Sequence, residues 1–138
     1  MSSCIKKINL KIITLSDKRG GRSKFILNNN NQIEIQRIEV DGCYIKQGKR
    51  CDYILSTENF DFLVELKGEG IKSGIEQLED TIHKFYVGDS KSKRGKKAII
   101  VATKTSPSTR SAIKTAKAKF KKYNSSLEVK NLIFETSI

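Results

Sequence analysis

The chain has 138 residues, and its 27 lysines and arginines outnumber its 15 aspartates and glutamates, which gives a formal charge of +12. This length fits one ordinary domain, so we expect residues 1–138 to form a single domain without a separate recognition domain. The longest aliphatic run, 98–102, is far shorter than the ~20 residues of a membrane-spanning helix. Because lysines interrupt the first apolar stretch, we expect no signal peptide, no membrane partner and a soluble, cytoplasmic protein.

The positive charge is concentrated in one part of the chain. Residues 84–122 contain 13 lysines and arginines but one acid, Asp89, whereas the rest of the chain is neutral. Such a block is typical of a protein that binds a polyanion, most often nucleic acid through its phosphates. A solvated basic surface gives the same pattern, so the charge alone defines no chemistry.

The cysteines give no metal-binding pattern. Cys4, Cys43 and Cys51 lack CxxC spacing, and together with His83, the single histidine, they are too scattered to favour a zinc site. We therefore expect reduced thiols, as in a cytosolic protein, and a partly exposed helical position for His83.

Short apolar patterns predict strands in the first half of the chain. Residues 5–15 fit either a strand or a helix, and the glycine turn at 17–22 either contacts phosphate or simply closes a hairpin. A period of two predicts a strand over 33–40, before an Asp-Gly turn. Residues 51–55 and 60–67 are predicted to be two further strands joined by a short turn.

A helical period begins after this hairpin. Apolar residues spaced 4-3-4-3 over 71–85 predict an amphipathic helix, with Ser73 and Glu76 spaced as a capping box at its start. Residues 88–97 are predicted to be a basic loop, and the aliphatic run 98–102 to be a strand buried on both faces.

The last third of the chain predicts a second helix and a closing strand. Ser106 and Pro107 have the types expected at a helix start, and Leu127–Phe134 is the expected strand. Beside the apolar stripe of this helix, about 100° around its axis, lies a basic stripe of Arg110, Lys114, Lys117 and Lys121. The predicted fold class is therefore α/β, with a mixed central sheet flanked by helices.

Two acids stand out on the predicted hairpin. If its turn is centred between residues 58 and 59, Asp52 lies opposite Glu65, with Cβ atoms about 5 Å apart on one face. Two carboxylates placed so repel each other unless a cation lies between them, and Mg²⁺ prefers such oxygen ligands. Lys67 shares the face of Glu65 and would position or help to deprotonate a metal-bound water, or neutralise a phosphate.

Alternatives without chemistry fit the same residues. Glu65 and Lys67 would also suit a solvated face, and Asp52 would also pair with Arg50 or Arg37.

The strands with Asp52 and with Glu65-Leu66-Lys67, followed by the helix with Gln77, resemble the PD-(D/E)xK nuclease superfamily over residues 35–104. The resemblance implies a restriction-endonuclease-like core. It implies that Asp52, Glu65 and the main-chain carbonyl of Leu66 bind metal, that Lys67 is the catalytic lysine, and that Gln77 adds a polar group.

Two positions depart from the family pattern. Cys51 stands where the motif has its proline. The upstream glutamate that the family commonly supplies has two candidates here, Glu34 and Glu39, of which Glu39 is preferred because it is nearer the hairpin.

These features together predict an endonuclease that depends on Mg²⁺ (or Mn²⁺) and hydrolyses DNA, with RNA left open as a substrate. Double-strand cleavage would require a homodimer or a partner subunit. The alternatives are a non-catalytic nucleic-acid-binding subunit on the same fold and a basic protein-interaction module. The residues expected to hold backbone phosphates are Lys91, Lys93, Arg94, Lys96, Lys97, Arg110, Lys114, Lys117 and Lys121.

Overall fold

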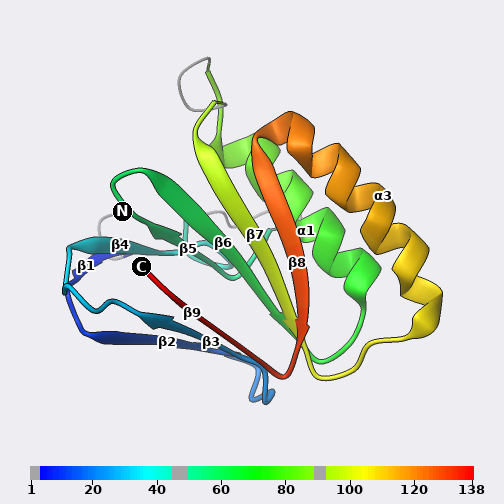
Figure 1. Cartoon of the computed structure of the whole chain (residues 1–138), viewed down its shortest axis with the longest axis horizontal. Helices are drawn as coiled ribbons and strands as arrows, with labels where there is room; N and C mark the ends of the chain where they lie inside the picture. Colours follow the sequence, from blue (N-terminus) through cyan, green and yellow to red (C-terminus); the bar gives the residue numbers. More distant parts are fainter. Residues whose placement is uncertain (1–3, 45–49, 89–92) are drawn as a thin grey trace.

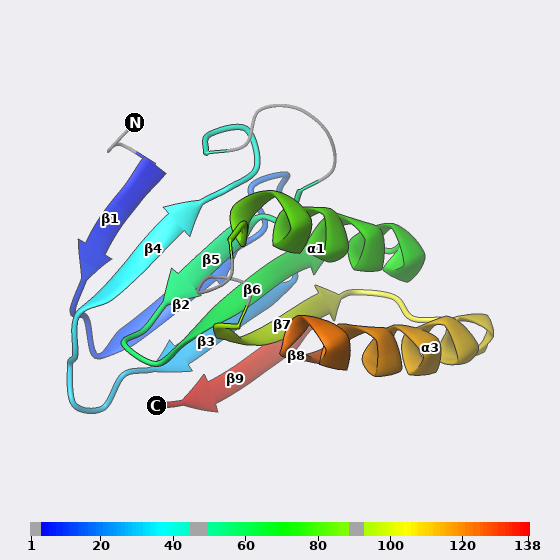
Figure 2. The same ribbon diagram turned by 90° about the horizontal axis from the view of Figure 1, so that it is seen from above.

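The computed structural model describes residues 4–44, 50–88 and 93–138, which form three layers (Figures 1 and 2). Two helices cover one face of a six-stranded sheet, and a three-stranded sheet covers its other face. The strands are β1 (Ile5–Ile8), β2 (Ile12–Ser16), β3 (Lys24–Asn28), β4 (Ile35–Glu39), β5 (Tyr53–Ser56), β6 (Phe60–Lys67), β7 (Gly95–Ala102), β8 (Ser125–Asn131) and β9 (Ile133–Ser137). The helices are α1 (Ile71–Phe85) and α3 (Arg110–Phe120), with short 3₁₀ turns η2 (Pro107–Thr109) and η3 (Lys121–Tyr123) on either side of α3.

The large sheet has the order β1-β4-β5-β6-β7-β8. Strands β1, β4, β5 and β6 pair antiparallel, whereas β6, β7 and β8 pair parallel. Parallel neighbours need a crossover connection, and α1 and α3 supply the two crossovers. The mixed α/β class expected from the sequence is confirmed.

The small sheet, with order β2-β3-β9, corrects two predictions of single strands. The segment 5–15 contains two strands, β1 and β2, which belong to different sheets, and the predicted strand Leu127–Phe134 is likewise split between β8 and β9. At the second break Leu132 takes a left-handed conformation with φ of 67°, which turns the chain from one sheet to the other.

Both faces of the large sheet are buried. Ile54, Leu63 and Ile100 pack against α1 and α3, while Phe62 and Val64 pack against the small sheet. The predicted burial of 98–102 on both faces is confirmed, because β7 is a central strand between the two cores.

The beginning of α1 differs from the prediction. Its N-cap is Gly70, with φ of 91°, and no side chain caps it; Ser73 lies inside the helix and donates a 3.5 Å hydrogen bond to Gln77. The predicted capping box of Ser73 and Glu76 is therefore wrong, because the chain enters the helix through a left-handed residue that favours glycine.

The predicted basic loop 88–97 also needs correction where the structure describes it. Strand β7 begins at Gly95, so Lys96 and Lys97 are strand residues rather than loop residues. The start of the second helical segment is confirmed, because the Ser106 side chain accepts a hydrogen bond from the Ser108 N–H and Pro107 begins η2.

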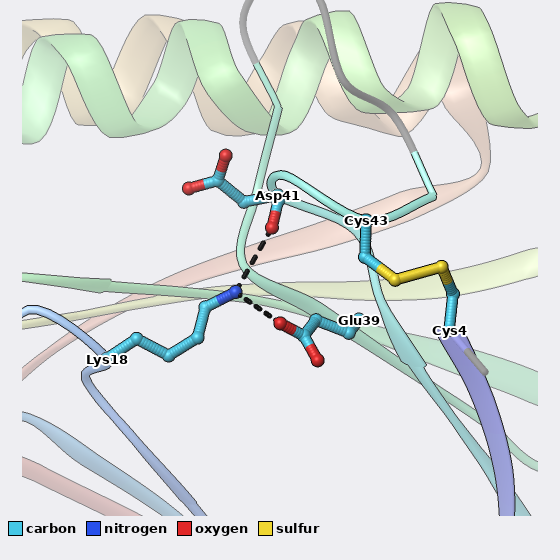
Figure 3. The surroundings of a disulfide bond; sticks show 5 residues. All are labelled: Cys4, Lys18, Glu39, Asp41 and Cys43. Atoms are coloured by element: carbon cyan, nitrogen blue, oxygen red, sulfur yellow. Dashed lines mark hydrogen bonds and ion pairs between the residues drawn. A yellow bond between two sulfur atoms is a disulfide. The ribbon is translucent and has the colours of Figure 1, made fainter.

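A disulfide joins Cys4, at the start of β1, to Cys43, in the turn after β4 (Figure 3). The expectation of reduced thiols is therefore wrong for these two residues, while Cys51 is a buried free thiol. Cysteines 39 residues apart became partners because β1 pairs with β4, a contact that spacing does not reveal. In the described part of the chain, no helix is long and apolar enough to cross a membrane.

Candidate active site

The hairpin of β5 and β6 has the register expected from the sequence. Tyr53 pairs with Val64, and Ile54 pairs with Leu63. The pairing continues to Asp52, whose N–H donates a 3.1 Å hydrogen bond to the Val64 carbonyl. Because side chains alternate along a strand, Asp52 and Glu65 lie beside each other on the face that α1 covers.

The Asp52 carboxylate is buried and has two hydrogen-bond donors. Its Oδ2 accepts from the Leu66 N–H at 2.9 Å and from Arg19 at 3.3 Å. Burial raises the pKa of Asp52, whereas the hydrogen bond from Leu66 and the charge of Arg19 oppose that rise. Neither Arg50 nor Arg37, the partners considered from the sequence, has a described ion pair with Asp52; Arg50 pairs with Asp41 at 2.8 Å.

The Glu65 side chain is 0% exposed, and neither of its carboxylate oxygens has a hydrogen-bond partner among the described residues. Its nearest described cation is Lys67, whose Nζ lies 3.8 Å from Oε2. Burial, and then the charge of Asp52, raise the pKa of Glu65 to about 9. A solvated face, the alternative considered for Glu65 and Lys67, is wrong for Glu65 and fits Lys67 poorly, since its side chain is 17% exposed.

Asp61, the other buried acid of β6, shows what a structural carboxylate has in this fold. Arg94 lies 2.9 Å from its Oδ1, and the Tyr86 hydroxyl donates to its Oδ2 at 2.5 Å. Glu65 has no comparable set of partners in the part of the chain described. A buried carboxylate left in this way is expensive to fold and is typical of a binding or catalytic site.

Arg19 is a site residue that the sequence did not single out. Its Nη2 donates to the Leu66 carbonyl at 2.7 Å and contacts Asp52 Oδ2. It therefore contacts two groups that the family resemblance assigns to the metal. Of the two roles that the sequence allows for the turn at 17–22, closing a hairpin is confirmed, because the turn joins β2 to β3.

Hydrogen bonds fix this turn against the end of β6. The Asp17 carboxylate accepts from the Arg19 N–H at 3.0 Å and from Nε at 3.1 Å, and the Ser23 hydroxyl donates to the Lys67 carbonyl at 2.8 Å. In Figure 1 the turn lies at the bottom, below the ends of β6 and β7. The carboxyl ends of parallel strands are the usual place for a ligand site in an α/β sheet.

The structure does not bring Glu39 together with Asp52 and Glu65. Glu39 pairs with Tyr53, which in turn pairs with Val64, so it lies on the opposite face of the sheet from Glu65. Its carboxylate accepts a 2.8 Å hydrogen bond from Lys18, beside the disulfide (Figure 3). The other candidate, Glu34, lies within 4.0 Å of Lys7 at the far end of β4.

Gln77 lies on α1 and contacts the segment before β5 that carries Asp52. Its side-chain amide donates a 3.3 Å hydrogen bond to the carbonyl of Arg50, two residues before Asp52. One turn later the Thr81 hydroxyl accepts a 2.7 Å hydrogen bond from the Cys51 N–H. These two side chains attach α1 to the segment that places Asp52; no described contact joins Gln77 to Glu65 or Lys67.

The residues predicted to hold phosphates fall into distinct groups. Arg94 forms an ion pair with Asp61. Lys96 is buried and donates hydrogen bonds to the Arg94 and Tyr123 carbonyls at 2.8 and 2.7 Å. Lys91 lies outside the described residues. The exposed members are Lys93, Lys97, Arg110, Lys114, Lys117 and Lys121.

The basic stripe Arg110, Lys114, Lys117 and Lys121 begins close to the end of β6. The Thr103 N–H donates to the Lys67 carbonyl at 3.1 Å, and the chain leads from there into η2 and α3. Arg110 and Lys117 line a hollow of about 430 Å³ at the start of this helix. The basic stripe therefore begins at the end of the molecule that holds Lys67.

Among the described residues, no group of three or more histidine, cysteine, aspartate or glutamate side chains is arranged to hold a metal. The oxygen donors gathered here are two carboxylates and the Leu66 carbonyl. Comparison with family models, with curated proteins and with solved structures finds no match. Any functional conclusion therefore depends on the geometry of the site.

Proposed function

We propose that this protein is a metal-dependent nuclease of the restriction-endonuclease-like type, with its active centre at Asp52, Glu65 and Lys67. The observation that carries the proposal is the fully buried Glu65 carboxylate, which has no hydrogen-bond partner among the described residues and lies beside a second buried acid. Two buried acids side by side lower the stability of a fold, because their charges repel each other and burial disfavours ionisation. Binding of a cation between them would explain why both are present.

The residues present fit Mg²⁺ or Mn²⁺. Asp52, Glu65 and the Leu66 carbonyl provide only oxygen donors, and Mg²⁺ commonly takes one or two carboxylates and keeps several waters. When bound, the ion would activate a water molecule and polarise the scissile phosphate. In that mode of binding, waters would supply the ligands beyond these three protein groups.

Lys67 provides the cationic group of this centre. Its ammonium lies 3.8 Å from Glu65 Oε2, and the Ser23 and Thr103 contacts to its main-chain carbonyl fix the backbone that carries it. From this position Lys67 can donate a hydrogen bond to an attacking water or to a phosphate oxygen. Gln77 would act on the centre through its hydrogen bond to the Arg50 carbonyl.

DNA is the proposed substrate because the basic stripe of α3 leads away from the same end of the sheet. Arg110 and Lys121 are 11 residues apart, which spans roughly 16 Å along a helix. Contacts of this kind hold phosphates without reading bases, which suits a nuclease directed by structure or by a partner.

The experiment is a cleavage assay on supercoiled plasmid and branched DNA with Mg²⁺, Mn²⁺ or EDTA. Wild type, Lys67→Ala and Glu65→Gln are compared, with Lys6→Ala and Glu58→Gln as exposed controls of the same types. Cleavage that needs metal, survives in both controls and is lost in both site variants supports the proposal. Equal cleavage by wild type and Lys67→Ala would identify a contaminant and overturn it.

The second candidate is a non-catalytic nucleic-acid-binding subunit on the same fold. One observation favours it: Arg19 lies on Asp52 and the Leu66 carbonyl, where a metal would bind. A protein of this class would bind DNA, cleave no substrate with either ion, and keep its affinity for DNA in Glu65→Gln.

A further inference from the structure

The cation that lies in the acidic site is a side chain of the protein itself. Arg19 Nη2 is 2.7 Å from the Leu66 carbonyl and 3.3 Å from Asp52 Oδ2. Its Nε is 3.1 Å from Asp17, and its Nη1 is 3.8 Å from Asp41. One guanidinium thus contacts three carboxylates and a carbonyl.

Resting on the nuclease function above, we propose that Arg19 is an internal counter-cation that competes with the divalent metal for Asp52 and the Leu66 carbonyl. In the metal-free protein Arg19 positions these two groups, and it leaves them when the metal binds. The step is an exchange of cations, in which no covalent bond forms or breaks.

Charge supports an exchange rather than simultaneous occupancy. The described carboxylates around Arg19 are Asp17, Asp41, Asp52 and Glu65, and the other cations beside them are Arg50 and Lys67. Lys18 also contacts the Asp41 carbonyl, but its charge is balanced by its partner Glu39. With every group ionised, as metal binding requires of the carboxylates, Arg19 would leave this cluster with one negative charge. With Arg19 withdrawn the cluster has two, which one divalent ion neutralises.

Hydrogen bonds and two glycines fix the conformation of the turn that carries Arg19. Asp17 holds both the Arg19 N–H and Nε, and the Asp17 side chain is itself 4% exposed. Gly20 has φ of 83°, and a Cβ on Gly21 would collide with the Asp17 carboxylate, so both positions favour glycine. The Arg19 side chain is 51% exposed, so solvent is available to receive it when it withdraws.

The test is calorimetric titration of EDTA-treated protein with Mn²⁺, a measurement independent of cleavage. Removing a competing cation is expected to tighten Mn²⁺ binding by about tenfold in Arg19→Ala, within the usual range for coupling between two binding events. The matched control is Arg22→Ala, which removes an exposed cation from the same turn and is expected to bind Mn²⁺ as wild type does.

Three further variants complete the experiment. Arg19→Lys keeps the charge but loses the planar fork that contacts Asp17 and Leu66 together, so its affinity should lie between those of wild type and Arg19→Ala. Arg19→Gln provides a second neutral side chain, and far-UV circular dichroism checks that each variant is folded. Glu65→Gln should lose Mn²⁺ binding.

The outcomes separate this inference from the proposed function. Unchanged or weaker Mn²⁺ binding in folded Arg19→Ala and Arg19→Gln, with loss in Glu65→Gln, would overturn the competition and leave the metal centre standing. Absence of Mn²⁺ binding in wild type and in both neutral variants would overturn the metal centre itself, and the competition with it.

Discussion

The ammonium of Lys67 lies 3.8 Å from Oε2 of Glu65, which is too far for a hydrogen bond, and no other described residue bonds to that carboxylate. In contrast, Asp61 on the same strand has both an arginine and a tyrosine hydroxyl within hydrogen-bond distance. Both acids are buried, but only Asp61 has an arginine beside one carboxylate oxygen and a hydrogen bond to the other.

Glu65→Gln is therefore expected to stabilise the metal-free protein while abolishing cleavage. The pKa of Glu65 is about 9 in the folded state, against 4.5 when unperturbed, so unfolding releases a proton between these pH values. The free energy of unfolding of wild type should consequently fall relative to that of Glu65→Gln as pH rises from about 5 to 8. Urea denaturation in EDTA at both pH values measures the difference.

Glu58→Gln, on the exposed turn of the same hairpin, is the control for that comparison and should follow wild type at both pH values. A Glu65→Gln protein that loses stability at pH 8 would show that the carboxylate has a structural role.

Exposed and partly buried cations of residues 84–122 should respond differently to truncation. Lys117 is exposed on α3, so Lys117→Ala should reduce the slope of log affinity for DNA against log salt by about one. Fluorescence anisotropy at several salt concentrations measures this slope.

Arg94→Ala removes the cation beside Asp61 and should lower the free energy of unfolding by roughly 1–3 kcal/mol. Urea denaturation measures this loss.

Wild-type affinity for DNA with almost no dependence on salt would contradict phosphate binding, and would favour the basic protein-interaction module considered from the sequence.

Acid should weaken the attachment between the two helices. Burial alone would raise the pKa of Glu79 on α1, but hydrogen bonds from Lys119 at 2.7 Å and Tyr123 at 2.5 Å outweigh it and lower the pKa. The ionised carboxylate therefore contributes stability above pH 4.5, which is lost as pH falls through its lowered pKa. Glu79→Gln should be less stable than wild type at pH 7, and the gap should narrow at pH 3.5.

Thermal unfolding of both proteins at the two pH values checks this. A gap of the same size at pH 3.5 would mean that the ionisation of Glu79 contributes nothing to stability.

The disulfide is expected to stabilise the edge of the large sheet. It closes a loop between residues 39 positions apart, for which chain entropy predicts about 2–4 kcal/mol. Reduction with dithiothreitol should lower the urea midpoint of wild type by a corresponding amount. The double variant Cys4→Ser, Cys43→Ser should already show the lower midpoint, and dithiothreitol should not change it. A change in the midpoint of the double variant would mean that the reductant acts through Cys51, the remaining cysteine.

Local sequence patterns determined the register of the β5–β6 hairpin, the helix α1 and the buried strand β7. The register of Asp52 against Glu65 follows from the length of the turn between two apolar strands, because a hairpin turn fixes which residues face each other. The apolar period of α1 and the aliphatic run of β7 were equally clear, since each element buries a defined face. These features are set by residues close together in the sequence, so the sequence predicts them.

Contacts between distant segments were decided by the tertiary structure alone. Residues 5–15 and 125–137 divide between two sheets because the chain must cover both faces of the central strands, which a local period does not encode. The same packing pairs Cys4 with Cys43, buries Lys96, places Glu39 across the sheet from Glu65, and brings Arg19 onto Leu66 across 47 residues of chain. The sequence by itself determined the two acids and the lysine of the candidate centre, whereas the contact of Arg19 with Asp52 and Leu66 depended on how a distant turn docks at the end of β6.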